Sequence, residues 1–469
     1  MKVFQPTQEQ HQVISHDFKL NPVLKVFAFA GAGKTTVLKA LAEASPGMRI
    51  LYLAFGRDIR DEAAAKFPSQ VECKTSHQMA WGYGRLYQHR LTQNLQMRDV
   101  AGLISSDDWM VVKGAMQTLT NYLASADHGM DAKHISREMR EASKDHRSKV
   151  TPAKLNRMLE GAKHLWNTMI DKDSNFPVVH DVYLKLYQLS KPDLSRYDMI
   201  LFDEAQDANP VTTDIVMRQK QVYRVLVGDT HQQIYRFRGA ENAMNDPSLK
   251  DAASLYLTGS FRFGQRIAAS ANAILQVVKG EQHKVQGLSP KEDGIIGARE
   301  FEELMESGKH KGEILALSRT GAGVLEKALD AMASGKKIYW IGTPQGYGVN
   351  DLQNLFYFKE GELQKVRNKK LIHDFTDFEE YREVAEASGD YEMNKLIRLL
   401  DKYGQKVPRY LSRIKECSTD DRGQADLVVS SAHRSKGLEA RFVSLNDDWP
   451  DISDPEVIAN ISREVMIDE

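Results

Sequence analysis

Short apolar runs alternate with helical patterns near the start of the chain. Lys25 to Phe29 is typical of a buried strand and leads into a glycine-containing stretch, Ala30 to Thr36, that opens a helical pattern. A second apolar run, Met48 to Phe55, predicts another strand, and the alanine-rich run Arg57 to Phe67 predicts a helix that Pro68 ends. This order of strand, helix, strand and helix predicts a parallel sheet.

The pattern changes over residues 86–190, where long charged helical segments replace the strands. Between Lys133 and Lys163 there are nine Lys or Arg residues against four Asp or Glu residues, a local charge of +5. Such a stretch is either a basic binding face or an ordinary solvated helix face, and the sequence leaves both open. We interpret residues 86–190 as a helical insertion.

Strands resume after this insertion. Tyr197 to Phe202 and Val222 to Val227 are apolar runs that end in acidic residues, and ligands of open α/β sheets bind beyond such strand ends. Ile314 to Ser318 and Leu427 to Ser431 predict two more strands. The region 344–425 between them has a mixed pattern, which we interpret as a second insertion.

The composition excludes several classes of protein. The chain has 469 residues, 42% of them hydrophobic and 27% charged, which is typical of a folded globular protein. No apolar run approaches the roughly 18 residues of a membrane span. With only Cys73 and Cys417 and no secretion signal, a cytoplasmic location is expected, associated with the nucleoid if the source is a prokaryote or phage. The 63 basic and 64 acidic residues balance, so any nucleic-acid site must be a local patch.

The stretch after the first strand has the residues of a phosphate-binding loop. Gly31 and Gly33 let backbone amides approach phosphates, Lys34 supplies positive charge, and Thr35 supplies a hydroxyl for Mg²⁺. The usual pattern has glycine where this chain has Ala28. Because a strand and a helix flank the loop, we predict a nucleotide site here.

Hydrolysis of a nucleotide also needs carboxylates. Asp203 and Glu204 follow the strand that ends at Phe202. One carboxylate can hold the metal ion and the other can orient or deprotonate the attacking water. Each of these residues alone is consistent with an ordinary acidic turn after a strand. The two together with the phosphate-binding loop favour a role in hydrolysis.

Two longer stretches resemble a known family. Asp203 to Asp207 and Val227 to Ala240 resemble the Walker B and third motifs of superfamily 1A helicases of the UvrD/Rep type. The Phe-Arg-Gly-Ala ending at Ala240, together with Leu184 to Pro192, is similar to the F-box helicase 1-like branch. Shorter matches to other motifs of the family extend from about residue 6 to about residue 445.

The resemblance implies a role for individual residues. Lys34, Thr35 and Asp203 would hold the phosphates of ATP and Mg²⁺, with Thr35 and Asp203 as metal ligands. Glu204 would activate water, and Gln232 and Arg262 would sense the γ-phosphate. The implied ATP-binding residues are Gln10, Gly31, Ala32, Gly33, Lys34, Thr35, Thr36, Phe261, Arg262, Gly437 and Glu439. The implied DNA contacts are Phe55, Thr75, His77, Tyr235, Phe237, Arg238 and His433.

The resemblance also implies a domain organisation, two RecA-like P-loop NTPase domains that each carry an insertion. The first would comprise residues 1–85 and 191–250 around the helical insertion 86–190. The second would comprise residues 251–343 and 426–469 around the insertion 344–425.

One motif of the family has no match in this sequence. The strand with a γ-phosphate-contacting arginine, motif VI, is not found before Glu469, and Ser462 to Glu469 resembles the helix that precedes that strand. A cut before motif VI, a separate completing polypeptide, and a chain that hydrolyses ATP poorly all stay open, and we favour the first. Arg262 or Arg463 would then supply part of the missing charge.

The resulting prediction is an ATP hydrolase that acts as a DNA helicase or translocase. Its partners would be single-stranded DNA, junctions of single- and double-stranded DNA, and an accessory or completing protein, with no membrane. The resemblance implies movement from 3′ to 5′ and work in DNA repair or recombination. Two alternatives are an ATP- and DNA-binding scaffold without motor activity, and a P-loop kinase for a small metabolite.

Overall fold

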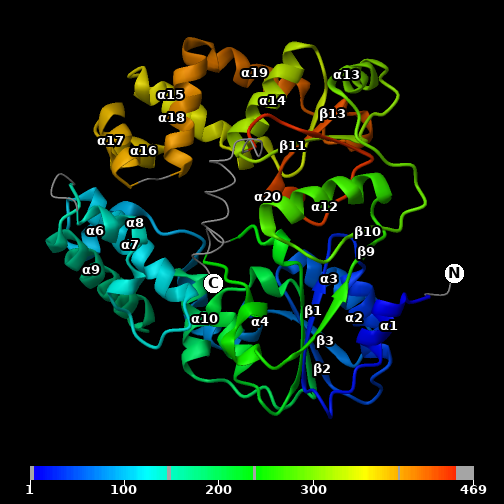
Figure 1. Cartoon of the computed structure of the whole chain (residues 1–469). Coiled ribbons are helices and arrows are strands. Elements are labelled where there is room, and N and C mark those ends of the chain that lie inside the picture. Colours follow the sequence, from blue (N-terminus) through cyan, green and yellow to red (C-terminus); the bar gives the residue numbers. More distant parts are fainter. Residues whose placement is uncertain (1–4, 145–148, 236–238, 389–390, 450–469) are drawn as a thin grey trace. The chain divides into compact units, whose positions relative to one another are not determined.

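The structure is a computed structural model (Figure 1) and describes residues 5–144, 149–235, 239–388 and 391–449. The chain divides into two compact units, Met1–Asp293 and Gly294–Glu469. Each unit contains a parallel sheet flanked by helices, so the predicted α/β class is confirmed. No helix in the described ranges has both the length and the apolar character that crossing a bilayer requires.

The first unit contains a six-stranded sheet in the order β3-β2-β6-β7-β1-β8. All five pairs of neighbouring strands are parallel. β2 and β6 are buried along their whole length, which explains why they occur in the sequence as uninterrupted apolar runs. The strands are β1 (Val23–Ala28), β2 (Ile50–Ala54), β3 (Val71–Thr75), β6 (Met199–Phe202), β7 (Tyr223–Gly228) and β8 (Ala253–Leu257).

Two apolar cores cover the two faces of this sheet. One core contains residues of α1 (Gln8–Ile14), α2 (Lys34–Glu43) and α3 (Arg57–Lys66). The other contains residues of α10 (His180–Leu189) and α11 (Pro210–Met217) and continues into the helical insertion. β6, β7 and β1 are neighbours in the sheet. The acidic residues that follow β6 and β7 therefore lie beside the glycine-containing loop that follows β1.

The division between the units differs from the expected boundary at residue 251. β8 lies within residues 251–343, the range expected for the second domain, but it pairs with β1 in the first sheet from Leu24 and Ala253 onward. α12 (Gln265–Lys279) also belongs to the first unit, which extends to Asp293. The run Ala253–Leu257 is short and only its last residue is buried, so the sequence carries little sign that it joins the first sheet.

α4 (Ser76–Met79) and α5 (Trp81–Gly84) follow β3 and precede the region 86–190. The described residues of that region are mainly helical, as the sequence predicts, with two short strands that were not foreseen. They form β4 (Leu91–Thr92), α6 (Met97–Ile104), α7 (Trp109–Ala124), α8 (Arg137–Ala142), α9 (Pro152–Ile170), β5 (Val178–Val179) and α10. α7 and α9 pack so closely that position 114 has no room for a side chain. A Cβ atom on Gly114 of α7 would lie 2.4 Å from Met158 Sδ of α9.

The basic stretch in this insertion makes many ion pairs. Lys133 pairs with Asp127 at 2.8 Å, and Lys163 pairs with Glu160 at 2.9 Å. Lys154 reaches outside the stretch and pairs with Asp108 at 2.9 Å. These pairs neutralise part of the local charge and favour the interpretation as a solvated helix face.

The second unit contains a four-stranded parallel sheet in the order β12-β13-β11-β14. Its strands are β11 (Ile314–Ser318), β12 (Ile338–Trp340), β13 (Leu427–Ser431) and β14 (Phe442–Leu445), and β11 and β13 match the predicted bounds. The described residues of region 344–425 contain the helices α15 (Val349–Lys359), α16 (Lys369–Asp374), α17 (Phe378–Ser388), α18 (Tyr391–Tyr403) and α19 (Val407–Cys417). Its interpretation as a second insertion stays a prediction. The other helices of this unit are α13 (Ala298–Glu306), α14 (Gly321–Ala333) and α20 (Ala432–Ser435).

Candidate nucleotide and nucleic-acid site

Two glycines shape the loop between β1 and α2. Gly31 and Gly33 have φ angles of +75° and +79°, in the left-handed region that favours glycine. A Cβ atom on Gly31 would lie 2.7 Å from both Ser260 Oγ and Arg262 Cβ, so close packing also requires glycine there. Gly33 precedes α2 and provides no side-chain cap. The amides of the first turn can therefore bind an anion.

We expect Gly31→Ala to destabilise the first unit more than Gly47→Ala does. Gly47 has a similar φ of +81°, but a Cβ atom there would meet nothing within 4 Å. Gly47→Ala should thus cost only the backbone strain of about 1–2 kcal/mol. Gly31→Ala should add an overpacking cost of about 1–3 kcal/mol. Urea denaturation measures both free energies of unfolding, and equal losses would contradict the close packing at Gly31.

Lys34, the first residue of α2, binds the acidic end of β6. Its Nζ atom donates to Glu204 Oε1 at 2.5 Å. Burial by itself lowers the pKa of Lys34, but the charges of Glu204, Asp203 and Asp229 outweigh it, and the pKa is raised above its ordinary value. Lys34 is therefore a fixed positive charge. Thr35 follows it in the first turn of α2 and is half-buried.

Asp203 lies beside Lys34 and Glu204 and is almost fully buried, with 3% of its surface exposed. Its Oδ2 atom accepts a hydrogen bond from Tyr52 Oη at 2.6 Å. Burial, and then the charge of Glu204, raise the pKa of Asp203. Burial also raises the pKa of Tyr52, so its hydroxyl group remains a donor. Tyr52 was not among the predicted site residues, and the only signal in the sequence is one hydroxyl group inside an apolar run.

Glu204 is held in place by its backbone and by Gln206. Glu204 has a φ of +51°, which is uncommon for a residue other than glycine. Gln206 is fully buried, and its Nε2 atom donates to Glu204 Oε2 at 2.6 Å and to Asp207 Oδ2 at 3.1 Å. Gln206, which was not a predicted site residue, therefore fixes the carboxylate orientation.

The same glutamine joins the end of β6 to the end of β7. Gln206 Oε1 accepts from the backbone N–H of Asp229 at 3.1 Å. Asp229 Oδ2 in turn accepts from Gln232 Nε2 at 2.5 Å. Burial raises the pKa of Asp229. The structure thus brings Lys34, Asp203, Glu204 and Gln232 together through Gln206 and through Asp229, one of the acidic residues that follow the predicted strands.

Gln10, Phe261 and Arg262 surround the glycine-containing loop. Gln10 is buried, and its Nε2 atom donates to the carbonyl of Ala32 at 3.3 Å. The backbone N–H of Phe261 donates to the carbonyl of Gly31 at 2.9 Å, while the Phe261 side chain is 49% exposed. The structure therefore places three predicted ATP-binding residues at one loop. A fourth predicted residue, Thr36, lies in the same turn of α2 as Lys34 and is exposed.

Two of the predicted DNA contacts stack on each other. The rings of Phe55 and Tyr235 have centroids 5.0 Å apart and an interplanar angle of 25°. Phe55 is 42% exposed. Phe237 and Arg238 lie outside the described residues. Phe55 directly follows β2, and Tyr235, which is half-buried, lies after β7. Base stacking on this pair stays a prediction.

Thr75 and His77 have structural partners. Thr75 is buried and caps α4 by accepting from the backbone N–H of Gln78 at 3.3 Å. His77 Nε2 lies 3.0 Å from Asp181 Oδ1. These contacts hold the end of β3 against α10, and DNA binding by either residue stays a prediction.

The remaining predicted residues, His433, Gly437 and Glu439, belong to the second unit. His433 lies in α20, directly after β13, and is half-buried. Gly437 has a φ of +83°, and both it and Glu439 are exposed. Arg434, next to His433, donates to the carbonyl of Gly346 at 2.7 Å and fixes the start of α20.

Comparison with known proteins identifies the family of this chain. Residues 6–251 match the UvrD/REP helicase N-terminal domain. The chain belongs to the UvrD/REP helicase family, which confirms the predicted resemblance.

Two relatives match almost the whole chain. F-box DNA helicase 1 of Gallus gallus is 32% identical over 470 residues, which cover 95% of this chain and 45% of that protein. F-box DNA helicase protein 1 of Schizosaccharomyces pombe is 30% identical over 482 residues, 94% of this chain and 53% of that protein. The putative ATP-dependent DNA helicase YjcD of Bacillus subtilis is 25% identical over 176 residues, 34% of this chain and 23% of that protein. The chain spans about half the length of the first two.

Proposed function

We propose that this chain binds ATP with Mg²⁺ and couples ATP hydrolysis to movement along single-stranded DNA. The observation that carries the proposal is the joining of Lys34, Asp203, Glu204 and Gln232 in one buried network at the carboxyl ends of β1, β6 and β7. A phosphate-binding loop, a water-activating carboxylate and a γ-phosphate sensor are what ATP hydrolysis needs within one site.

The residues present fit a magnesium ion held together with phosphates. Asp203 is a buried carboxyl group whose pKa is raised, so a divalent cation would stabilise its charged form. Thr35 supplies a hydroxyl group at the start of α2. Mg²⁺ is usually held by one or two protein carboxylates together with phosphates and water, so a site with few protein ligands suits it. Bound Mg²⁺ would neutralise charge on the phosphates.

In this proposal Glu204 activates the attacking water. Gln206 holds one carboxylate oxygen, and Lys34 binds the other. When a nucleotide enters, Lys34 would exchange Glu204 for the phosphates, because both are anionic and the loop amides lie beside it. That exchange would free one oxygen of Glu204 to accept a proton from water.

Gln232 would connect the nucleotide to DNA. It lies three positions before Tyr235, whose ring stacks on Phe55. Between them, the backbone N–H of Ile234 donates to Asp207 Oδ1 at 3.2 Å, so the segment is anchored to the acidic end of β6. A change at the γ-phosphate could therefore move an aromatic ring that stacks on a base.

We expect Phe55→Ala to weaken binding of single-stranded DNA by about 1–3 kcal/mol, the range for losing one base–aromatic stack. Ile59→Ala, on the neighbouring helix α3, is the control, because Ile59 has a similar exposure of 36%. Fluorescence anisotropy with a labelled oligothymidylate measures both affinities. Equal affinities for the two variants would contradict stacking at Phe55.

The finer features of the proposal come from the family resemblance. They are two RecA-like domains with insertions at 86–190 and 344–425, movement from 3′ to 5′, and action at junctions of single- and double-stranded DNA in repair or recombination. The alternative is a scaffold that binds ATP and DNA without motor activity.

Steady-state ATP hydrolysis with and without single-stranded DNA tests the proposal. We expect DNA to stimulate turnover at least about tenfold, since DNA must favour the hydrolysis-competent arrangement of the site, and an allosteric coupling of 1–3 kcal/mol corresponds to about 5–150-fold. Binding of both ligands without stimulated turnover would favour the scaffold.

A further inference from the structure

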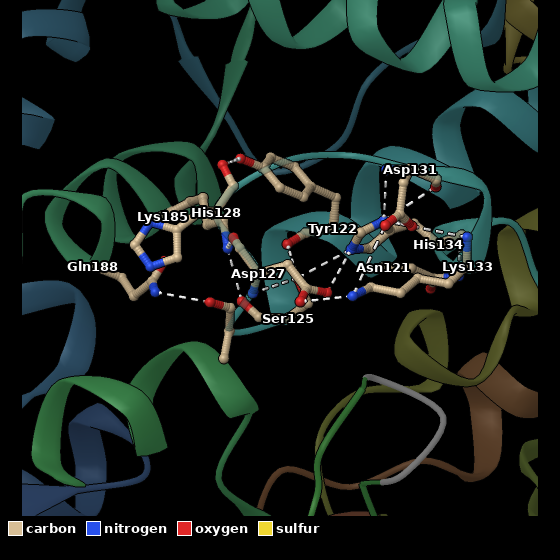
Figure 2. Close-up of polar contacts among 11 residues, drawn as sticks. Asn121, Tyr122, Ser125, Asp127, His128, Asp131, Lys133, His134, Lys185 and Gln188 are labelled. Carbon is tan, nitrogen blue, oxygen red and sulfur yellow. Dashed lines mark hydrogen bonds and ion pairs between the residues drawn. The ribbon is translucent and has the colours of Figure 1, made fainter. Parts of the chain in front are cut away.

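A buried lysine in the insertion holds the loop that follows α7. Lys185 of α10 has no exposed surface. Its Nζ atom donates to the backbone carbonyls of Ser125 at 2.8 Å and Asp127 at 2.5 Å, and it lies 4.6 Å from the centroid of the Tyr122 ring (Figure 2). Burial lowers the pKa of Lys185 to about 8. Burying a cation costs folding free energy, so a lysine at this position points to a specific structural task.

Gln188, one helical turn further along α10, also hydrogen-bonds to this loop. Its Nε2 atom donates to the carbonyl of Ala126 at 3.1 Å and to Asp214 Oδ2 of α11 at 2.7 Å. Three consecutive carbonyls, those of residues 125–127, are thus bound by two side chains of α10. Through Gln188 the loop is also tied to α11, the helix that follows the acidic end of β6.

Asp127, within this loop, also contacts two basic residues that follow the loop. Asp127 accepts from Lys133 at 2.8 Å and lies 3.0 Å from Nε2 of the buried His134 (Figure 2). Tyr122 Oη donates to the carbonyl of His128 at 3.3 Å. We define residues 125–131 as the brace loop. It is short, bonded on both sides and therefore rigid.

Ala124, the residue before the brace loop, lies against Gly239. Gly239 has a φ of +75°, and a Cβ atom on it would lie 2.9 Å from Ala124 Cβ. The backbone N–H of Ala240, the next residue, donates to the carbonyl of Tyr235 at 3.4 Å. The position of Ala124, just before the brace loop, therefore limits where Gly239 and Tyr235 can lie.

We propose that Lys185 is a positioning residue that, through the brace loop and Ala124, sets the positions of Gly239 and Tyr235. Its loss would loosen Tyr235 relative to Gln232 and weaken the coupling between DNA and the nucleotide site. This inference rests on the proposed function, because it assigns Lys185 a part in DNA-stimulated turnover. Lys185 itself touches neither ligand.

Lys185→Met tests this role, since methionine keeps the length of the side chain and removes its charge and donors. We expect the KM for ATP and the turnover without DNA to stay within roughly twofold of wild type. The maximal stimulation by single-stranded DNA should fall by about 3- to 30-fold, the range for residues along a coupling network. A loss of stability alone would not produce this split.

Lys133→Met is the matched control. Lys133 bonds to the same loop at Asp127, but it is 57% exposed, and surface pairs contribute little. Its DNA stimulation should remain within roughly twofold of wild type.

Ala124→Val provides a second route should Lys185→Met not fold. Ala124 ends α7 and is half-buried, so the larger side chain would press on Gly239 without opening the core. It should lower the stimulation in the same way, and combining it with Lys185→Met should lower it less than the product of the two effects. Full stimulation in folded Lys185→Met, or in Ala124→Val, would overturn the inference. No stimulation of the wild-type chain would instead overturn the proposed function, and this inference with it.

Discussion

Glu204→Gln is expected to remove most ATP turnover and to leave ATP binding close to that of the wild-type chain. Glutamine keeps the size of the side chain and can still contact Gln206, but it cannot accept a proton from water. General base catalysis contributes about 10²–10⁴-fold, so DNA-stimulated turnover should fall by that factor. A coupled phosphate-release assay measures turnover, and a fluorescent ATP analogue measures affinity.

Glu62→Gln is the control for this prediction. Glu62 is 64% exposed and pairs with Lys66 on the surface of α3. The substitution removes the same charge outside the network, so turnover should be unchanged. If Glu204→Gln kept wild-type turnover, the role of Glu204 as the base would be wrong.

Lys34→Met should reduce both affinity for ATP and turnover. Lys34 is the only lysine in the network and carries a raised pKa, so its charge is present at every physiological pH. Removing one preorganised donor to developing charge costs about 10²–10³-fold in rate. Unlike Glu204→Gln, this substitution should also weaken binding of the nucleotide, which isothermal titration can measure.

Lys39→Met separates this effect from a general effect on α2. Lys39 lies five positions further along the same helix, is 41% exposed and pairs with Glu43. Wild-type affinity and turnover are expected for it. If the two lysine variants bound ATP equally well, Lys34 would not contact the phosphates.

Part of the first sheet could be predicted because its central strands β2 and β6 are buried along their whole length. β2 and β6 occur as uninterrupted apolar runs, and glycine or acidic residues mark their ends. The strand β8 was not predicted, because its pairing with β1 depends on an edge that only the folded sheet defines. The helices of residues 344–425 were not predicted one by one, because the region is divided into several short elements from α15 to α19.

The site was predictable where chemistry is concentrated in a short motif. Lys34, Asp203 and Glu204 stand out because charged residues follow apolar strands. Tyr52 and Gln206 do not, since their importance lies in the hydrogen bonds to those carboxylates across the sheet. Lys185 shows the same limit, because a lysine in a helical pattern predicts an exposed side chain, and only the folded insertion reveals its burial.

Translocation along single-stranded DNA is the central claim, and a stopped-flow assay tests it directly. Oligothymidylates of increasing length would carry a fluorophore at the 5′ or the 3′ end, and ATP would be added together with a trap for free protein. We predict a lag that grows linearly with DNA length for the 5′ label and no length-dependent lag for the 3′ label. Signals independent of length at both ends, with ATP hydrolysed normally, would contradict movement along DNA.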